Sequence, residues 1–145
     1  MTQFQPDDSL GYLVNRAARL MAAALGRRLA PYGVAIGQWA VLLFLYERDG
    51  RTQAELSRVV AIEPPTMVRT IDRMVRDGLV ERRPDPGDAR AVRIVLTDRS
   101  RELREPLLTA ARAVNAEAMA VLGAQRTQQT RDGLRALIER FTGPA

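Results

Sequence analysis

The sequence contains no cysteine and no histidine, and these two absences exclude several kinds of chemistry. A chain without them forms no disulfide, builds no zinc site from thiolates or imidazoles, and has no cysteine or serine–histidine nucleophile system. A site made of carboxylates alone stays open, but the 17 acidic residues are scattered among 22 basic ones without an obvious constellation. We therefore expect no enzyme activity, no metal site and no cofactor.

Lysine is absent as well, so all 22 basic residues are arginine, and the net charge is +5. Arginine binds phosphate through two parallel hydrogen bonds and fits a narrow minor groove of DNA. The coding bias of a G+C-rich genome is nevertheless the better explanation for the total count. Only the positions of individual arginines can therefore indicate a function.

Long apolar runs are missing too. No run approaches the roughly 18 residues that a membrane-spanning helix needs, and residues 1–10 lack the basic and then apolar pattern of a signal peptide. The length of 145 residues suits one domain, and 46% hydrophobic with 27% charged residues is typical of a folded globular protein. We expect a cytoplasmic protein that does not enter a membrane.

Periodicity predicts a series of helices in the first half of the chain. Apolar residues recur at three- and four-residue steps over residues 8–29, which predicts an amphipathic helix. Residues 39–46 are apolar on nearly every face and, with the two residues that follow, predict a short buried helix. Thr52 and Glu55 have the spacing of a capping box, in which each side chain bonds the main-chain amide of the other, so a third helix is expected to start there.

A fourth helix is expected from the proline pair at residues 64–65 to residues 77–78, because proline is tolerated in a first helical turn. Its side chains divide into two faces. The face expected to point inward comprises Val68, Ile71, Met74 and Val75. The polar face, at steps of three and four residues, comprises Thr66, Arg69, Thr70 and Arg73.

The second half of the chain begins with a predicted hairpin. Residues 79–83 and 91–96 alternate with the two-residue period of strands, and residues 84–88 supply turn residues between them. Thr97 then caps a helix that runs to about residue 122. After Gly123 a last helix carries apolar residues at helical spacing, namely Leu134, Leu137, Ile138 and Phe141.

This order of elements is that of a winged helix-turn-helix within a mainly α fold that has a small β-hairpin wing. The polar helix would enter the major groove, and the candidate DNA-binding residues on it are Pro65, Thr66, Arg69, Thr70 and Arg73. Any surface helix can show polar residues at this spacing, but the hairpin favours DNA because its charged tip contributes little to stability. In a wing, Arg90 can enter the minor groove while Asp88 holds its guanidinium.

Several short motifs together resemble the MarR family of bacterial transcription regulators. They are residues 38–39 and 41–42, the helix start at 52–56, residues 78–80 with Arg83, and Asp88, Arg90 and residues 96–97 around the wing. Residues 62–72, with the run Val68-Arg69-Thr70, are most similar to the SlyA branch of that family. Ala89 departs from the pattern, because many relatives carry a second arginine in the wing.

The resemblance implies a homodimer that regulates transcription from a pseudo-palindromic site on double-stranded DNA, as a repressor or by relieving silencing. It implies an N-terminal dimerisation helix (residues 1–33), the winged helix-turn-helix (34–97) and C-terminal dimerisation helices (98–145) in one compact domain. The residues agree, because the last helix alone cannot bury its apolar side chains together with those of the helix before it. Packing against the first helix of the same chain is the alternative.

The resemblance also implies a pocket for a small aromatic acid or phenol between the dimerisation helices and the winged domain. Arg16 and Arg19 are candidate partners of an anionic group, and Tyr12, Trp39 and Leu43 are candidate walls. For Trp39, core packing is the favoured interpretation. The competing function is a winged-helix module that binds protein without ligand control, but such a surface would show aromatic or methionine anchors.

Overall fold

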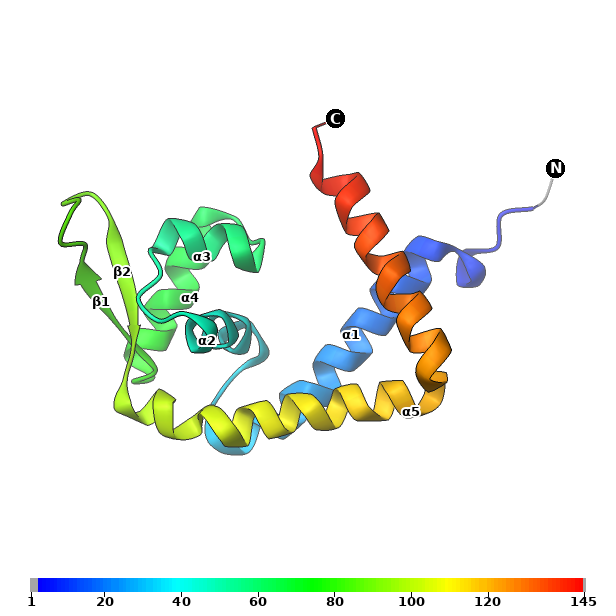
Figure 1. Cartoon of the computed structure of the whole chain (residues 1–145), viewed down its shortest axis with the longest axis horizontal. Coiled ribbons are helices and arrows are strands. Elements are labelled where there is room, and N and C mark those ends of the chain that lie inside the picture. The colour runs from blue at the N-terminus through cyan, green and yellow to red at the C-terminus, as the bar shows by residue number, and fades with distance from the viewer. Residues whose placement is uncertain (1–2, 145) are drawn as a thin grey trace. The chain divides into compact units, whose positions relative to one another are not determined.

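The computed structural model describes residues 3–144 and is mainly helical with one antiparallel hairpin (Figure 1). The elements are α1 (Leu10–Leu29), α2 (Ile36–Glu47), α3 (Gln53–Val60), α4 (Pro64–Arg76), β1 (Val80–Pro84), β2 (Val92–Leu96) and α5 (Asp98–Thr142), with 3₁₀ turns at Pro6–Asp8 and Ala30–Tyr32. This confirms the predicted fold class.

The chain divides into two compact units, Met1–Ala110 and Ala111–Ala145. The functional division at residues 33 and 97 stays a prediction.

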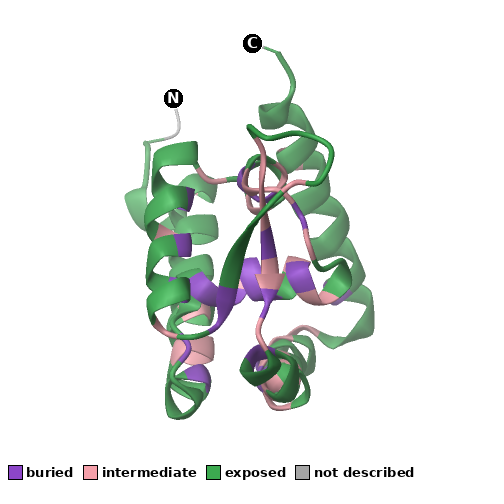
Figure 2. Ribbon diagram, turned by 90° about the vertical axis from the view of Figure 1, so that its left-hand side faces the viewer, coloured by how far each residue is buried: buried purple, intermediate pink, exposed green. Residues whose placement is uncertain are grey.

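The core of the first unit receives side chains from every helix in it and from both strands. The largest fully buried side chains are Leu29, Leu42, Leu45, Leu56, Met67, Ile71, Met74, Leu79, Ile94, Leu107, Val41 and Val80. Figure 2 shows these buried positions gathered inside, while the outer surfaces of the helices are exposed. Each such side chain stabilises the fold by about 1.5–3 kcal/mol relative to exposure. The core therefore holds α4 and the hairpin in a fixed relation to each other.

Local interactions set the ends of α3 and α4. The Thr52 hydroxyl accepts the Glu55 amide (3.1 Å) and caps α3 as predicted, but the Glu55 carboxylate pairs with Arg48 (2.7 Å) rather than completing the capping box. The helix closes at Ala61, which adopts a left-handed conformation with φ of 60°. α4 then begins at Pro64, in agreement with the prediction.

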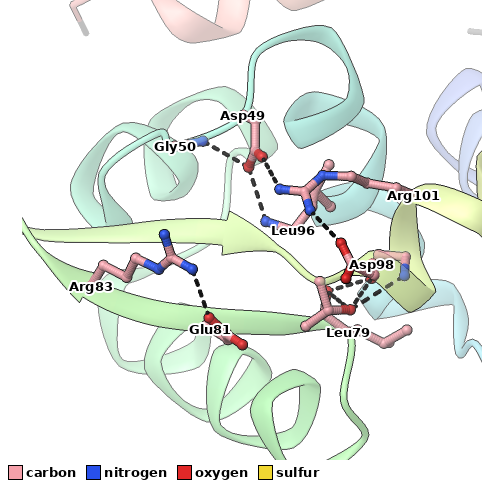
Figure 3. Close-up of polar contacts among 10 residues, drawn as sticks. Asp49, Gly50, Leu79, Glu81, Arg83, Leu96, Asp98 and Arg101 are labelled. Atoms are coloured by element: carbon pink, nitrogen blue, oxygen red, sulfur yellow. Dashed lines mark hydrogen bonds and ion pairs between the residues drawn. The ribbon is translucent and has the colours of Figure 1, made fainter.

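One carboxylate ties the base of the hairpin to the helices on either side of it. Asp49, just after α2, accepts hydrogen bonds from the amides of Gly50 (2.8 Å) and Leu96 (2.9 Å). It also pairs with Arg101 of α5 (3.3 Å), which in turn pairs with Asp98 (3.0 Å; Figure 3). The end of β2 is thereby fixed to the end of α2 and to the start of α5.

Tyr46 joins α2 to α5 a second time. Its hydroxyl donates to the carbonyl of Ser100 (2.6 Å). Burial raises the pKa of Tyr46 to about 12, although the positive charge of Arg104 partly offsets that effect. The phenol is therefore a protonated donor at neutral pH.

α4 differs from its predicted burial at two positions. Ile71 and Met74 are fully buried as expected, and Met67, absent from the predicted set, is buried with them. Val68 and Val75, which were expected to point inward, are each 40% exposed. Each successive residue turns by about 100° around a helix of 3.6 residues per turn, so positions 68 and 75 fall at the edge of the strip centred on 67, 71 and 74.

α5 is interrupted at Gly123, as the sequence predicts, with φ of 77° and ψ of 167°. The following helix exposes Ile138 (65%) and Phe141 (79%). By length and composition α5 could cross a membrane, since an 18-residue window within it has a mean hydropathy of 1.2, with 17% of that window buried. Helices from the cores of soluble proteins pass the same test, so the expectation that the protein does not enter a membrane stays a prediction.

Candidate nucleic-acid interface

α4 presents a polar surface opposite its buried residues. Pro65, Thr66, Arg69 and Arg73 are exposed, and Thr70 is half-buried. The structure therefore places all five of the predicted helix residues on the solvent side of one element. A single α-helix fits the major groove of B-DNA, which is about 12 Å wide.

Hydrogen bonds within α4 already engage both threonine hydroxyls. Arg69 Nη2 donates to Thr66 Oγ1 (3.3 Å), and Thr70 Oγ1 donates to the carbonyl of Thr66 (2.9 Å). By contrast, the guanidinium of Arg73 has no hydrogen bond or ion pair with any residue in 3–144. Arg73 is thus ready to accept an external anion, whereas Arg69 must give up one weak contact to do so.

The tip of the wing is organised by Asp85. Its Oδ1 accepts hydrogen bonds from the amides of Gly87 (2.7 Å) and Asp88 (3.1 Å), and its Oδ2 pairs with Nε of Arg93 (2.8 Å). The Gly87 amide, the charge of Arg93 and the Asp88 amide lower the pKa of Asp85, while desolvation opposes them. The tip is therefore a defined turn stabilised by an ionised carboxylate.

Asp88 does not hold the guanidinium of Arg90 as predicted. Its Oδ1 accepts the main-chain amide of Arg90 (2.9 Å), as Asp side chains often do two residues ahead in turns. The Arg90 guanidinium is exposed and has no partner within the described part of the chain. Asp88 thus shapes the loop that carries Arg90 and leaves the side chain itself available.

Two arginines that were not among the predicted site residues brace the wing. Arg82 of β1 pairs with Asp72 of α4 (2.6 Å) and donates to the carbonyl of Val68 (3.3 Å). Arg93 of β2 donates to the carbonyl of Gly50 (2.8 Å) on the other side of the hairpin. These contacts join residues far apart in sequence, so spacing alone gave no signal for them.

The C-terminal end of α4 is fixed to the start of α2. Gln38 Nε2 donates to Oδ2 of Asp77 (2.8 Å), while its Oε1 accepts the Ala35 amide (3.0 Å). Asp77 also accepts from Arg76 (3.1 Å), and the hydrogen bonds from Arg76 and Gln38 lower the pKa of Asp77. Arg99 donates to the carbonyls of Asp77 and Tyr32, which extends the network to α5.

A pocket of about 730 Å³ lies beside this network. Its walls are α1, the start of α2 and the end of α4, and its lining residues are Arg19, Ala22, Ala23, Gly26, Ala30, Gly33, Val34, Ala35, Ile36, Gln38, Arg73, Arg76 and Asp77. Among residues 3–144, His, Cys, Asp and Glu side chains form no group of three or more that could hold a metal ion. The lining of the pocket thus holds three arginines and one carboxylate, Asp77, which pairs with Arg76.

The structure does not gather the five predicted ligand residues around this pocket. Arg19 lines it, but Tyr12, Arg16, Trp39 and Leu43 do not. Trp39 is only 6% exposed and belongs to the core, the interpretation favoured from the sequence, because α2 turns it inward with Val41 and Leu42. Tyr12 and Leu43 are about 40% exposed on their helices.

Known proteins of the same fold resemble nearly the whole chain. Residues 32–91 match the model of the MarR family. The uncharacterized HTH-type transcriptional regulator YwoH of Bacillus subtilis is 35% identical over 94 residues, which cover 65% of this chain and 68% of that protein. A probable transcriptional regulator from Pseudomonas aeruginosa is 31% identical with a TM-score of 0.84, covering 92% of this chain and 100% of that one.

The structure of a third relative was solved in complex with DNA. The M. tuberculosis transcriptional regulator MosR, in complex with DNA, is 30% identical with a TM-score of 0.75, covering 92% of this chain and 98% of that one. The likeness thus covers most of the chain rather than the winged helix-turn-helix alone. The proteins of these matches are transcriptional regulators and not enzymes. The chain belongs to the MarR family of transcriptional regulators.

Proposed function

We propose that the protein is a homodimeric regulator that binds a pseudo-palindromic operator on double-stranded DNA, with α4 in the major groove and the wing in the adjacent minor groove. The observation that carries this proposal is the pair of exposed, unpartnered guanidinium groups, Arg73 on α4 and Arg90 on the wing. A braced hairpin holds both on one rigid body. That MosR, at 30% identity, was solved in complex with DNA supports DNA as the partner.

Footprinting on duplexes selected from a random library tests this proposal. We expect two protected half-sites about one helical turn, or about 10 base pairs, apart from centre to centre. Protection of a single unpaired half-site, or no sequence-specific binding at all, would contradict it. A reporter gene behind the selected site then separates repression, which we propose as the main mode, from relief of silencing.

The dimer is proposed from exposed apolar side chains at both ends of the chain. On α1, Leu10 and Leu20 are 62% and 56% exposed, and Ile138 and Phe141 near the C-terminus are more exposed still. Soluble proteins seldom leave so many large apolar side chains in water without a partner surface. A second copy supplies matching surfaces by symmetry.

We also propose that a small aromatic acid or phenol binds in the 730 Å³ pocket and lowers DNA affinity. Arg19, Arg73 and Arg76 supply cations for the acidic group, while Ala22, Ala23 and other small residues leave room for a flat ring. Because Arg73 belongs also to the proposed DNA face, an anion that attracts it competes with phosphate or base contacts. Coupling of this kind is typically about 1–3 kcal/mol.

Titrating salicylate into a preformed complex with operator DNA tests the ligand proposal. DNA affinity should fall roughly 5- to 150-fold at saturation. Arg19→Ala should remove the effect, whereas Arg16→Ala, on the same helix but outside the pocket, should retain it. Salicylate-independent DNA binding at millimolar concentration, or equal loss in both variants, would contradict this site.

The competing function, a winged-helix module that binds protein, predicts no sequence-specific DNA complex under the same footprinting conditions. Within the MarR family we propose placement in the SlyA-like branch, on the run Val68-Arg69-Thr70. That placement predicts an operator shared with SlyA-type regulators, and cross-binding in gel shifts checks it. We propose that the protein acts in the cytoplasm, where it meets its DNA.

A further inference from the structure

Val68 is an apolar side chain on α4 that the rest of the described chain leaves 40% exposed. The preceding residue, Met67, is fully buried, and the following residue, Arg69, is exposed. Val68 is the fifth residue of α4, and the N-terminal part of a recognition helix is the part that contacts base edges. Its isopropyl group thus lies where a groove floor would come close.

We propose that Val68 reads the C5-methyl group of a thymine in the major groove and thereby selects an A·T pair at one position of each half-site. Thymine is the one base that presents a methyl group there, and apolar side chains recognise it by contact. The inference rests on the proposed function, in which α4 occupies the major groove.

The surroundings of Val68 favour an apolar contact over a polar one. The hydroxyl of Thr70 donates to the carbonyl of Thr66 within the helix (2.9 Å), so it does not have to be desolvated without a partner when bases approach. The carboxylate of Asp72, one turn further along, is neutralised by Arg82 (2.6 Å). The paired carboxylate of Asp72 therefore adds no unbalanced negative charge beside Val68.

The same arginine fixes the backbone that carries this side chain. Arg82 Nη2 donates to the carbonyl of Val68 (3.3 Å), so the strand β1 positions residue 68 directly. A β-branched residue in a helix has one strongly preferred χ1 rotamer. The methyl groups of Val68 are thus held in place before DNA arrives, which is what discrimination between two bases differing by one methyl group requires.

Val75 provides a matched control on the same helix. It is also 40% exposed and lies two turns after Val68 on the same side, about 10 Å further along the axis. That distance takes it beyond the N-terminal half of α4, towards the anchored end at Asp77. A general effect of shortening an exposed valine should appear in both Val68→Ala and Val75→Ala. A loss of discrimination between thymine and deoxyuridine should appear only in Val68→Ala.

The experiment combines protein variants with deoxyuridine in the DNA. The full-length protein selects its preferred duplex from a random library, and each thymine in a half-site is then replaced singly by deoxyuridine, which lacks only the methyl group. Dissociation constants are measured for the wild type, Val68→Ala and Val75→Ala. Alanine favours helix more than valine does, and circular dichroism with thermal unfolding checks that both variants fold.

In the wild type, one substitution per half-site should weaken binding about fourfold, the effect of one buried methyl group. Val68→Ala should bind the thymine and deoxyuridine duplexes equally, while Val75→Ala should discriminate as the wild type does. Should Val68→Ala unfold, Val68→Thr keeps one methyl group and should show reduced discrimination.

Specific binding that is insensitive to deoxyuridine at every position would overturn this inference and leave the proposed function standing. Full discrimination in Val68→Ala, or its loss in Val75→Ala, would overturn it equally. Absence of any sequence-specific complex would instead overturn the proposed function, and this inference with it.

Discussion

Arg69 and Arg90 are expected to contribute to DNA affinity in different ways. Arg69 lies on the outer face of α4, so Arg69→Ala should cost roughly 1–3 kcal/mol and relax the preference at particular base positions. Arg90 extends from the wing, and Arg90→Ala should weaken binding to A·T-flanked sites more than to G·C-flanked ones, because a narrow minor groove attracts its guanidinium. Gel shifts with operator variants at about 150 mM salt measure both effects.

Wild-type affinity in both of these variants would refute the DNA contacts assigned to the two arginines. Asp88→Ala gives a further comparison, because it removes the acceptor of the Arg90 amide and leaves the guanidinium in place. It should therefore imitate Arg90→Ala only partly, through a looser tip.

The wing should respond to acid through Asp85. Its pKa is lower in the folded protein than the ordinary value of 3.8, so the stability it contributes is fully present above that value. That contribution is lost as the pH falls below 3.8 and through the lowered pKa. Asp85→Asn removes both the titration and the ion pair with Arg93, so the difference in unfolding free energy between the two proteins should be constant near neutrality and shrink in acid. Parallel pH profiles of wild type and variant would count against this role.

The conformation of a single residue is predictable from the sequence when the interaction that sets it involves near neighbours in the chain. The Thr52 cap and the proline start of α4 follow from neighbours within three residues, and the structure has both. The prediction that Val68 points inward is wrong because a helical period gives the direction of a face but not its width, which the packing of α4 against the core decides. The predicted bond from the Arg90 guanidinium to Asp88 is wrong because the main-chain amide of Arg90, two residues ahead, is closer to the carboxylate than the end of a long side chain is.

At the scale of elements, the joint between α2, β2 and α5 depends on Asp49. Asp49→Ala leaves the partly buried amide of Leu96 without its acceptor and breaks the pair with Arg101, so the protein should lose about 1–3 kcal/mol of unfolding free energy. Asp98→Ala is the matched control, since its side chain is 96% exposed and pairs with the same arginine. A surface pair contributes only about 0–1 kcal/mol. Urea denaturation of both variants measures the difference, and equal losses would refute the special role of Asp49.

The sequence predicts helices and strands where apolar periodicity and turn residues indicate them. It does not predict the side-chain bonds that join one element to another. The two strands and the break at Gly123 lie where turn residues and alternation place them. The bonds from Gln38 to Asp77 and from Arg82 to Asp72 span the chain between elements, and no period or motif encodes them. The pocket in which we propose that a ligand binds shows the same limit, because Arg19 is the one residue of the five predicted that lines it.

At the scale of the whole molecule, the last part of α5 should decide the oligomeric state. A chain that ends before Thr127 loses the exposed apolar residues Ile138 and Phe141, and should sediment as a monomer that no longer binds a two-half-site operator. Phe141→Asp is a milder test, because a charge on a side chain that is 79% exposed does not disturb a monomer but is costly in a buried interface. A dimer that persists in both variants would place the interface elsewhere.

The pair of Arg82 with Asp72 ties the wing to α4, and the bond from Arg93 to Gly50 ties it to the turn after α2, so we expect the wing and α4 to move together. Once α4 is bound in the major groove, the contact of Arg90 with the adjacent minor groove forms within the same complex. The effective concentration of Arg90 at that groove is then far above the concentration of free protein in solution. In a flexible hairpin Arg90 would sample many orientations, so its effective concentration at the minor groove would be lower. Breaking the Arg82–Asp72 pair should thus weaken the contact made by Arg90 even though neither residue of the pair touches the minor groove.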